Sequence, residues 1–63
     1  MIQINPSELR KGDTFKIQGK RKWYKAEDIF PYPLNSYMVY FKKSSIEYGR
    51  LTLYKDDILI LHQ

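Results

Sequence analysis

The chain has 63 residues, with eleven Lys or Arg against seven Asp or Glu for a formal net charge of +4, and it has no Cys. This length predicts one small domain, residues 1–63, without room for a deep catalytic cavity. The lack of Cys excludes disulfide and zinc–cysteine scaffolds. No apolar run approaches the roughly 20 residues of a spanning helix, and no basic-then-apolar leader begins the chain, so we expect a cytoplasmic protein without membrane contact.

Positive charge is concentrated in residues 10–25. This segment holds seven Lys or Arg and one Asp, a balance of +6, so the rest of the chain sums to −2. Such a local basic segment is typical of a protein that directs one face toward a polyanion. A mixed, solubilising surface is the alternative explanation.

The first predicted element is a short helical turn. Asn5 can cap a helix in which Pro6 takes the first position, and the carboxylate of Glu8 can reach back to the cap amide. Leu9 is the expected core anchor, and Gly12 supplies a left-handed residue that ends such a turn. One to two turns fit here, which is too short to be stable without packing.

From residue 13 to 18 the apolar period changes to two. Phe15 and Ile17 share one face, which predicts a half-buried strand. A tight turn at Gly19 follows, and a second strand is expected to begin near Arg21.

The second strand has two possible registers. In the first, Tyr24 and Ala26 point inward and Trp23 lies outside among cations. The opposite register buries Trp23, which is favourable for so large an apolar side chain, and exposes Tyr24. We favour the first because Ala26 has no other reason to lie inside a strand.

Three further strands complete the expected fold. The prolines within 30–36 cannot donate hydrogen bonds to a sheet, so a loop is expected to end the second strand there. Strands are predicted over 37–42 and 48–54, and a 3₁₀ turn at 55–57 precedes a last apolar strand, 58–61, whose register is undecided. The side chains expected to point inward from the third and fourth strands are Tyr37, Val39, Phe41, Leu51 and Leu53.

Five short strands with polar connections predict an all-β meander, and closure into a small barrel would protect its edges. Residues 9–13 lead into an alternating strand, a Gly turn and a longer bent strand, and a turn at 55–57 precedes the final strand. Together these features resemble the small SH3-like β-barrels, which include KOW-type and Tudor-type modules and many short phage or bacterial proteins. The Gly-rich second strand of a KOW motif is replaced here by residues 20–25. The resemblance covers residues 9–61 and implies a five-stranded SH3-like barrel with one short helical turn near the N-terminus.

Residues 20–25 read Lys-Arg-Lys-Trp-Tyr-Lys and interleave cations with aromatic rings. Cations engage the phosphates of nucleic acid, and aromatic rings stack on its bases. We therefore expect a non-enzymatic nucleic-acid-binding protein. No helix long enough for the major groove is predicted, so the sequence indicates no base specificity. Single-stranded DNA or RNA is favoured because it suits exposed aromatic rings better than a duplex does. A buried Trp23 with lysine chains folded around it is the structural alternative. The expected binding residues are Lys16, Lys20, Arg21, Lys22, Trp23, Lys25, Tyr40 and Lys42.

Other chemistry has less support. The acidic pairs at 27–28 and 56–57 are explained by turns and charge balance, because neighbours on a strand point to opposite faces, so we expect no metal site. His62 lies at the chain end and Ser44 lacks a nucleophile elbow, so we expect neither an enzyme nor a cofactor. An aromatic cage for a methylated cation would require three tyrosines near strand ends to converge. These are Tyr32, Tyr37 and Tyr48.

A protein-interaction module is the second hypothesis. Such a module would inhibit a host enzyme or serve as a subunit of a larger assembly. It would bind its partner through an aromatic groove or by adding a strand at an open edge. The strand at 58–61 and the loop at 31–36 are the expected contact sites. A homodimer formed through an uncovered edge is compatible with both hypotheses. The small size suggests an accessory or regulatory protein of a phage or another mobile element.

Overall fold

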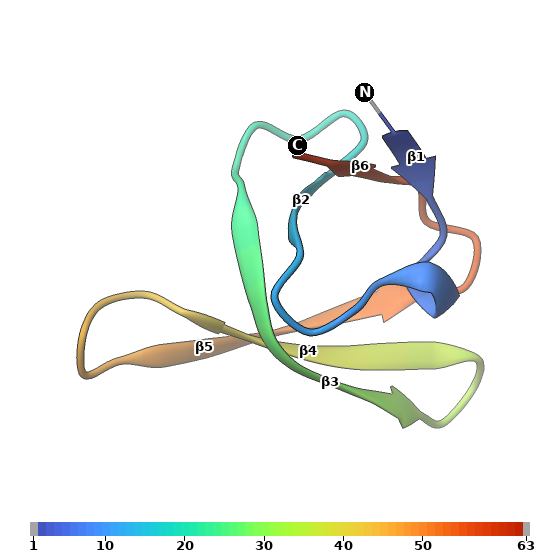
Figure 1. Cartoon of the computed structure of the whole chain (residues 1–63). Helices are drawn as coiled ribbons and strands as arrows, with labels where there is room; N and C mark the ends of the chain where they lie inside the picture. The colour runs from blue at the N-terminus through green and yellow to red at the C-terminus, as the bar shows by residue number, and fades with distance from the viewer. Residues whose placement is uncertain (1, 63) are drawn as a thin grey trace.

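A computed structural model describes residues 2–62, which form antiparallel strands and one 3₁₀ turn (Figure 1). The strands pair in the order β1-β6-β2-β3-β4-β5. The chain is therefore all-β, as expected, and within residues 2–62 no helix has the length and apolar character needed to cross a membrane. The elements are β1 (Ile2–Ile4), η1 (Pro6–Glu8), β2 (Thr14–Ile17), β3 (Tyr24–Tyr32), β4 (Ser36–Lys42), β5 (Tyr48–Tyr54) and β6 (Leu59–Leu61).

The expected five-stranded closed barrel is not found. A sixth strand, β1, pairs with β6 and places Ile4 opposite Leu59. β1 and β5 stand at the two ends of the strand order, so the sheet is open over the described residues. Figure 1 shows a curved sheet in which β1, β6 and β2 lie at one side, the long β4–β5 hairpin lies at the other, and β3 runs between them.

β3 bends where it passes from one partner to the other. Its start pairs with β2, with Thr14 opposite Lys25, and from Ala26 onward it pairs with β4. The register shifts between Ala26 and Asp28, so Glu27 is an extra residue. A β-bulge of this kind increases the local twist and bends the strand.

The expected loop at 30–36 is shorter than predicted. β3 continues through Pro31, which lies opposite Tyr37. Proline is tolerated because β2 pairs only with the start of β3, so this part of β3 is an edge that needs no second hydrogen-bond partner. The turn itself spans residues 33–35 and is closed by the hydroxyl of buried Ser36, which donates to the Pro33 carbonyl at 2.7 Å.

Every strand contributes an inward side chain to the core, and Ile4 is the contribution of β1. Of the predicted inward set, Val39, Phe41 and Leu53 are buried, whereas Tyr37 and Leu51 are half-buried. The sequence left the register of the last strand undecided, and the structure places Leu59 inside. The residues of the main buried cluster are Ile4, Leu9, Phe15, Ala26, Val39, Leu53 and Leu59.

The first turn differs from its predicted form. η1 is a single 3₁₀ turn, and the side chain of Asn5 makes no capping hydrogen bond. Its Nδ2 instead donates to the main-chain carbonyl of Asp57 at 3.2 Å, which ties this turn to the β5–β6 connection. Leu9 is buried, as expected, but Gly12, with φ 96°, lies in the following turn rather than at the helix end.

Candidate nucleic-acid interface

Trp23 lies on the surface immediately before β3, with 39% of its area exposed. The next residue, Tyr24, packs inward on Phe15 with the ring centroids 5.6 Å apart. Adjacent residues of an extended chain point to opposite sides, so the indole is directed away from the core. The favoured register, with Tyr24 and Ala26 inside and Trp23 outside, is confirmed.

Two polar side chains flank the indole. The Nζ atom of Lys16 on β2 lies 5.1 Å from the centroid of the Trp23 ring. His62, which follows β6, meets the indole edge-on with the centroids 5.5 Å apart. The backbone N–H of His62 donates to the Thr14 carbonyl at 2.9 Å, so pairing between β6 and β2 sets the position of this side chain. We call Lys16, Trp23 and His62 the Trp23 cluster.

Lys22 belongs to a different part of the surface. Its Nζ atom lies 5.3 Å from the ring centroid of Tyr24 and 5.5 Å from that of Phe41. Those two rings contact each other on the inner side of the sheet, with centroids 4.6 Å apart. Lys22 therefore covers an end of the core. The cations of the predicted basic segment do not all lie on the same side of the sheet as Trp23. Lys20 and Arg21 are exposed in the connection before β3, and Lys25 is exposed on β3 itself.

Tyr40 and Lys42 lie on the outer side of the β4–β5 hairpin. Across the strand pair Tyr40 is opposite Arg50, and Lys42 is opposite Tyr48. Phe30 on β3 meets the Tyr40 ring edge-on with the centroids 5.3 Å apart. This side of the hairpin thus alternates aromatic rings with cations. We call Phe30, Tyr40, Lys42, Tyr48 and Arg50 the hairpin face.

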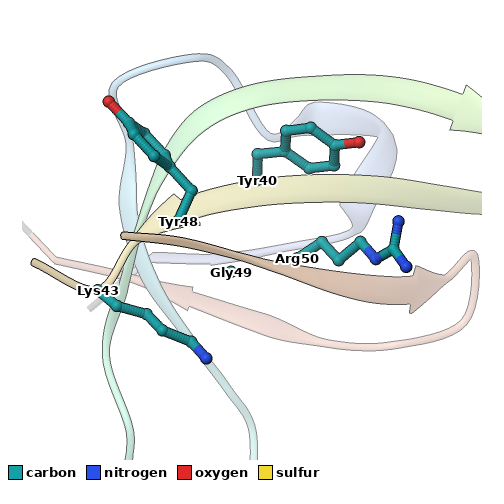
Figure 2. Close-up of a pocket in the computed structure, with 5 residues that line it drawn as sticks. All are labelled: Tyr40, Lys43, Tyr48, Gly49 and Arg50. Carbon is teal, nitrogen blue, oxygen red and sulfur yellow. The ribbon is translucent and has the colours of Figure 1, made fainter. Parts of the chain in front are cut away.

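A hollow of about 390 Å³ opens beside this hairpin (Figure 2). Figure 2 shows the rings of Tyr40 and Tyr48 projecting to the same side of the two strands, while the long side chains of Lys43 and Arg50 extend in other directions. We call this feature the hairpin hollow. Its lining residues are Tyr40, Lys43, Tyr48, Gly49 and Arg50.

Gly49 is required at its position by close packing. A Cβ atom there would lie 2.6 Å from Cζ of Phe41 and 2.8 Å from Cε of Lys43. Real Cβ atoms do not approach carbon so closely, because dispersion contacts between carbons are optimal at about 3.5–4.0 Å. Glycine therefore allows the Phe41 ring and the Lys43 chain to lie against β5.

Sequence reasoning did not assign Lys43, Gly49 or Arg50 to a site, and it considered Tyr48 only as part of an aromatic cage. The alternation over 48–54 did place Arg50 toward water, but no local pattern shows which residue of one strand lies opposite which residue of the next. The register that places Tyr40 opposite Arg50 depends on the length of the connection between β4 and β5. That length was the signal in the sequence that could have indicated the pairing.

The suggested aromatic cage is wrong. Tyr32 pairs with Ser36 beside the β3–β4 turn, whereas Tyr48 pairs with Lys42 at the opposite end of β4. Tyr37 neighbours neither of them in register. Three rings that lie on different parts of the sheet cannot enclose one cation.

Acidic side chains serve turns. Asp57 Oδ2 accepts a hydrogen bond from the Tyr54 N–H at 2.9 Å, and Asp13 Oδ2 accepts one from the Arg10 N–H at 2.9 Å. The turn interpretation of the pair at 56–57 thus has a direct contact behind it. Among residues 2–62, no three His, Cys, Asp or Glu side chains gather closely enough to hold a metal ion.

Comparisons of the chain with protein-family models, curated proteins and solved structures gave no match. A β-sheet architecture by itself accommodates many functions, so function has to be inferred from the chemistry of the surface. Within residues 2–62, exposed rings and cations meet at the Trp23 cluster and at the hairpin face.

Proposed function

We propose that the protein binds single-stranded nucleic acid through the Trp23 cluster and the hairpin face, without catalysing a reaction. The observation that carries the proposal is the exposed indole of Trp23 with the Lys16 ammonium 5.1 Å from its centroid. A base can stack on the ring while the cation attracts the neighbouring phosphate. Stacking of this kind contributes about 1 to 3 kcal/mol per base.

The exposed rings favour a single strand over a duplex. In a duplex the faces of the bases are covered by their neighbours, whereas an unpaired strand offers each face to an aromatic side chain. Tyr40 and Tyr48 are 37% and 58% exposed, so both rings are accessible to a base. β3 connects the two groups, because Trp23 precedes it and Phe30 lies near its end.

The salt dependence of binding follows from the number of cations on these surfaces. The Trp23 cluster contributes Lys16, the hairpin face contributes Lys42 and Arg50, and Lys25 is exposed on β3 between them. If each contacts one phosphate, the logarithm of affinity falls with the logarithm of salt concentration at a slope near −3, from about 0.7 per contact.

A fluorescence titration tests the proposal. The single Trp reports the binding of an oligodeoxythymidine of about 12 nucleotides, within the range of site sizes for small β-domains. Lys16→Gln is expected to weaken binding and reduce the slope by about 0.7. Lys55→Gln is the matched control, since this lysine is exposed in the turn after β5, and it is expected to bind as the unmodified chain does.

A labelled oligonucleotide extends the test to the indole itself. Followed by anisotropy, Trp23→Leu is expected to bind about tenfold or more weakly, which corresponds to the loss of one stacked base. An affinity that is independent of salt, or that is the same in Lys16→Gln, Trp23→Leu and Lys55→Gln, would contradict the proposal.

The biological setting is part of the same proposal. Small size, net positive charge and the likeness of the sequence to SH3-like modules support an accessory or regulatory role in the cytoplasm, of the kind that phages encode. Trp23 and the Lys16 ammonium beside it supply the chemistry of a binding surface, and the role proposed for it is non-enzymatic.

A protein-binding role is the second candidate, and one observation favours it. Leu34, in the β3–β4 turn, is 92% exposed and has φ 62°. A non-glycine residue in this region costs about 1 to 2 kcal/mol, and such strain is often retained for function. β5 also ends the strand order and can accept an added strand. Dimerisation in sedimentation equilibrium that Leu34→Asn abolishes, with no oligonucleotide binding, would favour this candidate.

A further inference from the structure

We propose that the hairpin hollow is a subsite for one nucleotide, with Tyr40 and Tyr48 offering aromatic rings to the base and with Lys43 and Arg50 attracting the phosphate. The inference rests on the proposed function and specifies how one unit of the strand is bound at this place.

The two tyrosines bring aromatic rings to the hollow from neighbouring strands. Tyr40 lies opposite Arg50 and Tyr48 lies opposite Lys42, so the tyrosines are diagonal neighbours on the same side of the hairpin. Diagonal side chains of an antiparallel pair are about 7–8 Å apart. Figure 2 shows the two rings turned away from each other, so a base that enters the hollow can stack on one of them.

One wall of the hollow is held in place before a ligand arrives. The Phe30 ring packs edge-on against Tyr40 at 5.3 Å between centroids. This contact restricts the Tyr40 ring, and a restricted side chain loses less entropy on binding. Tyr48 has more of its surface exposed and is the wall that can adjust to the ligand.

The dimensions of the hollow fit a nucleotide. Its volume of about 390 Å³ falls within the range of about 300–1,000 Å³ found for small-molecule sites. Gly49 lies between Tyr48 and Arg50 on β5 and also lines the hollow (Figure 2). A larger residue at this position would displace Phe41 and Lys43, which lie against β5.

Charge around the hollow favours an anion. Lys43 and Arg50 line it, and Lys42 is adjacent on β4. Two carboxylates lie nearby, Asp28 opposite Tyr40 on the β3 side and Glu47 in the connection before β5. Three cations against two carboxylates leave an excess of positive charge, and Asp28 lies across β4 from Arg50.

Backbone NMR titrations with three separate probes test the inference: adenosine 5′-monophosphate, adenosine and inorganic phosphate. Adenosine 5′-monophosphate is expected to shift the amide signals of residues 40–50 and to bind more tightly than either other probe. Arg50→Gln is expected to weaken the monophosphate and leave adenosine unchanged. Equal shifts with inorganic phosphate alone, or shifts spread over the whole chain, would overturn the inference.

Two tyrosines of β5 provide a matched pair of variants. Tyr48 and Tyr54 are each 58% exposed on the same side of the strand, but only Tyr48 lines the hollow. Tyr48→Ala is expected to weaken the monophosphate about fivefold or more, and Tyr54→Ala is expected to have no effect. Tyr48→Phe keeps the ring and is expected to bind normally, so it provides a readout if Tyr48→Ala unfolds. Equal affinities in all three variants would refute the subsite.

The oligonucleotide titration separates this inference from the proposed function. If the oligonucleotide quenches Trp23 but the monophosphate shifts no signal in residues 40–50, the subsite is refuted and the proposed function stands. If the oligonucleotide does not bind but the monophosphate still binds in a manner that requires the Tyr48 ring, the subsite stands and the proposed function is refuted.

Discussion

Gly49→Ala is a direct test of the packing beneath the hairpin hollow. The added Cβ would meet Cζ and Cε2 of Phe41 at 2.6 and 2.8 Å and Cε of Lys43 at 2.8 Å. Lys43 is exposed and can move aside, whereas Phe41 is buried and in contact with Tyr24, so the ring has to shift within the core. The steric cost therefore comes from Phe41.

The expected magnitude combines two opposing effects. Inserting a carbon into a packed core costs about 1 to 3 kcal/mol, and replacing glycine by alanine in a strand returns about 0.5 to 1 kcal/mol of backbone entropy. We expect Gly49→Ala to lose about 1 kcal/mol net. With a urea dependence near 1 kcal/mol per molar for so small a chain, the unfolding midpoint should fall by about 1 M.

Urea unfolding followed by circular dichroism measures this shift, and a double-mutant cycle assigns its cause. Phe41→Leu removes the two ring atoms that the new Cβ would meet, so Gly49→Ala should cost nothing in that background. Lys43→Ala should not rescue the variant. A Gly49→Ala chain that is as stable as the unmodified one, or that Lys43→Ala rescues and Phe41→Leu does not, would refute the packing argument.

Two turn substitutions have opposite expected signs. Leu34→Asn should stabilise the fold by about 0.5 to 1 kcal/mol in urea unfolding, because asparagine tolerates the positive φ of 62° that leucine does not, whereas Ile46→Asn, at a similarly exposed residue outside the positive-φ region, should change little. Destabilisation by Leu34→Asn would contradict this explanation. Asp57→Ala should destabilise the fold by about 1 kcal/mol, since it removes the carboxylate that accepts the Tyr54 N–H, and Asp56→Ala removes the same charge from the same turn as a control. Equal midpoints for the two aspartate variants would show that charge, and not the hydrogen bond, sets the effect.

The parts of the fold that sequence predicted correctly are strands with one buried side. Phe15, Val39 and Leu53 are each fully buried and each belong to an alternating segment, so the period of two determined which residues point inward. β1 was missed because it has three residues and its partner, β6, lies at the other end of the chain. No local pattern reports such a pairing. Pro31 was wrongly predicted to end the strand. A proline is tolerated inside a strand where one edge has no hydrogen-bonded partner, and the sequence does not show which part of β3 has such an edge.

The candidate site was predictable for one indole and not for the surface as a whole. Inward packing of Tyr24 and Ala26 determines that Trp23 faces out. Alternation left two registers open, and the small side chain of Ala26 decided between them. The location of Lys22 depends on the contact between Tyr24 and Phe41, which come from strands adjacent in the sheet but distant in sequence. A run of cations in sequence therefore did not become a single surface. The hairpin hollow likewise depends on the β4–β5 register.

The Trp23 cluster raises a question of competition, because the face of the indole already has a cation over it. Lys16 contributes about 0.5 to 1 kcal/mol to this contact at an exposed site. In the proposed complex a stacked base would contribute about 1 to 3 kcal/mol on the same ring, which exceeds the contribution of the ammonium. In the proposed complex the Lys16 ammonium would leave the ring and pair with a neighbouring phosphate, since Lys16 itself stays on β2. In the free protein Lys16 covers part of the indole face, and the proposed base would replace it there.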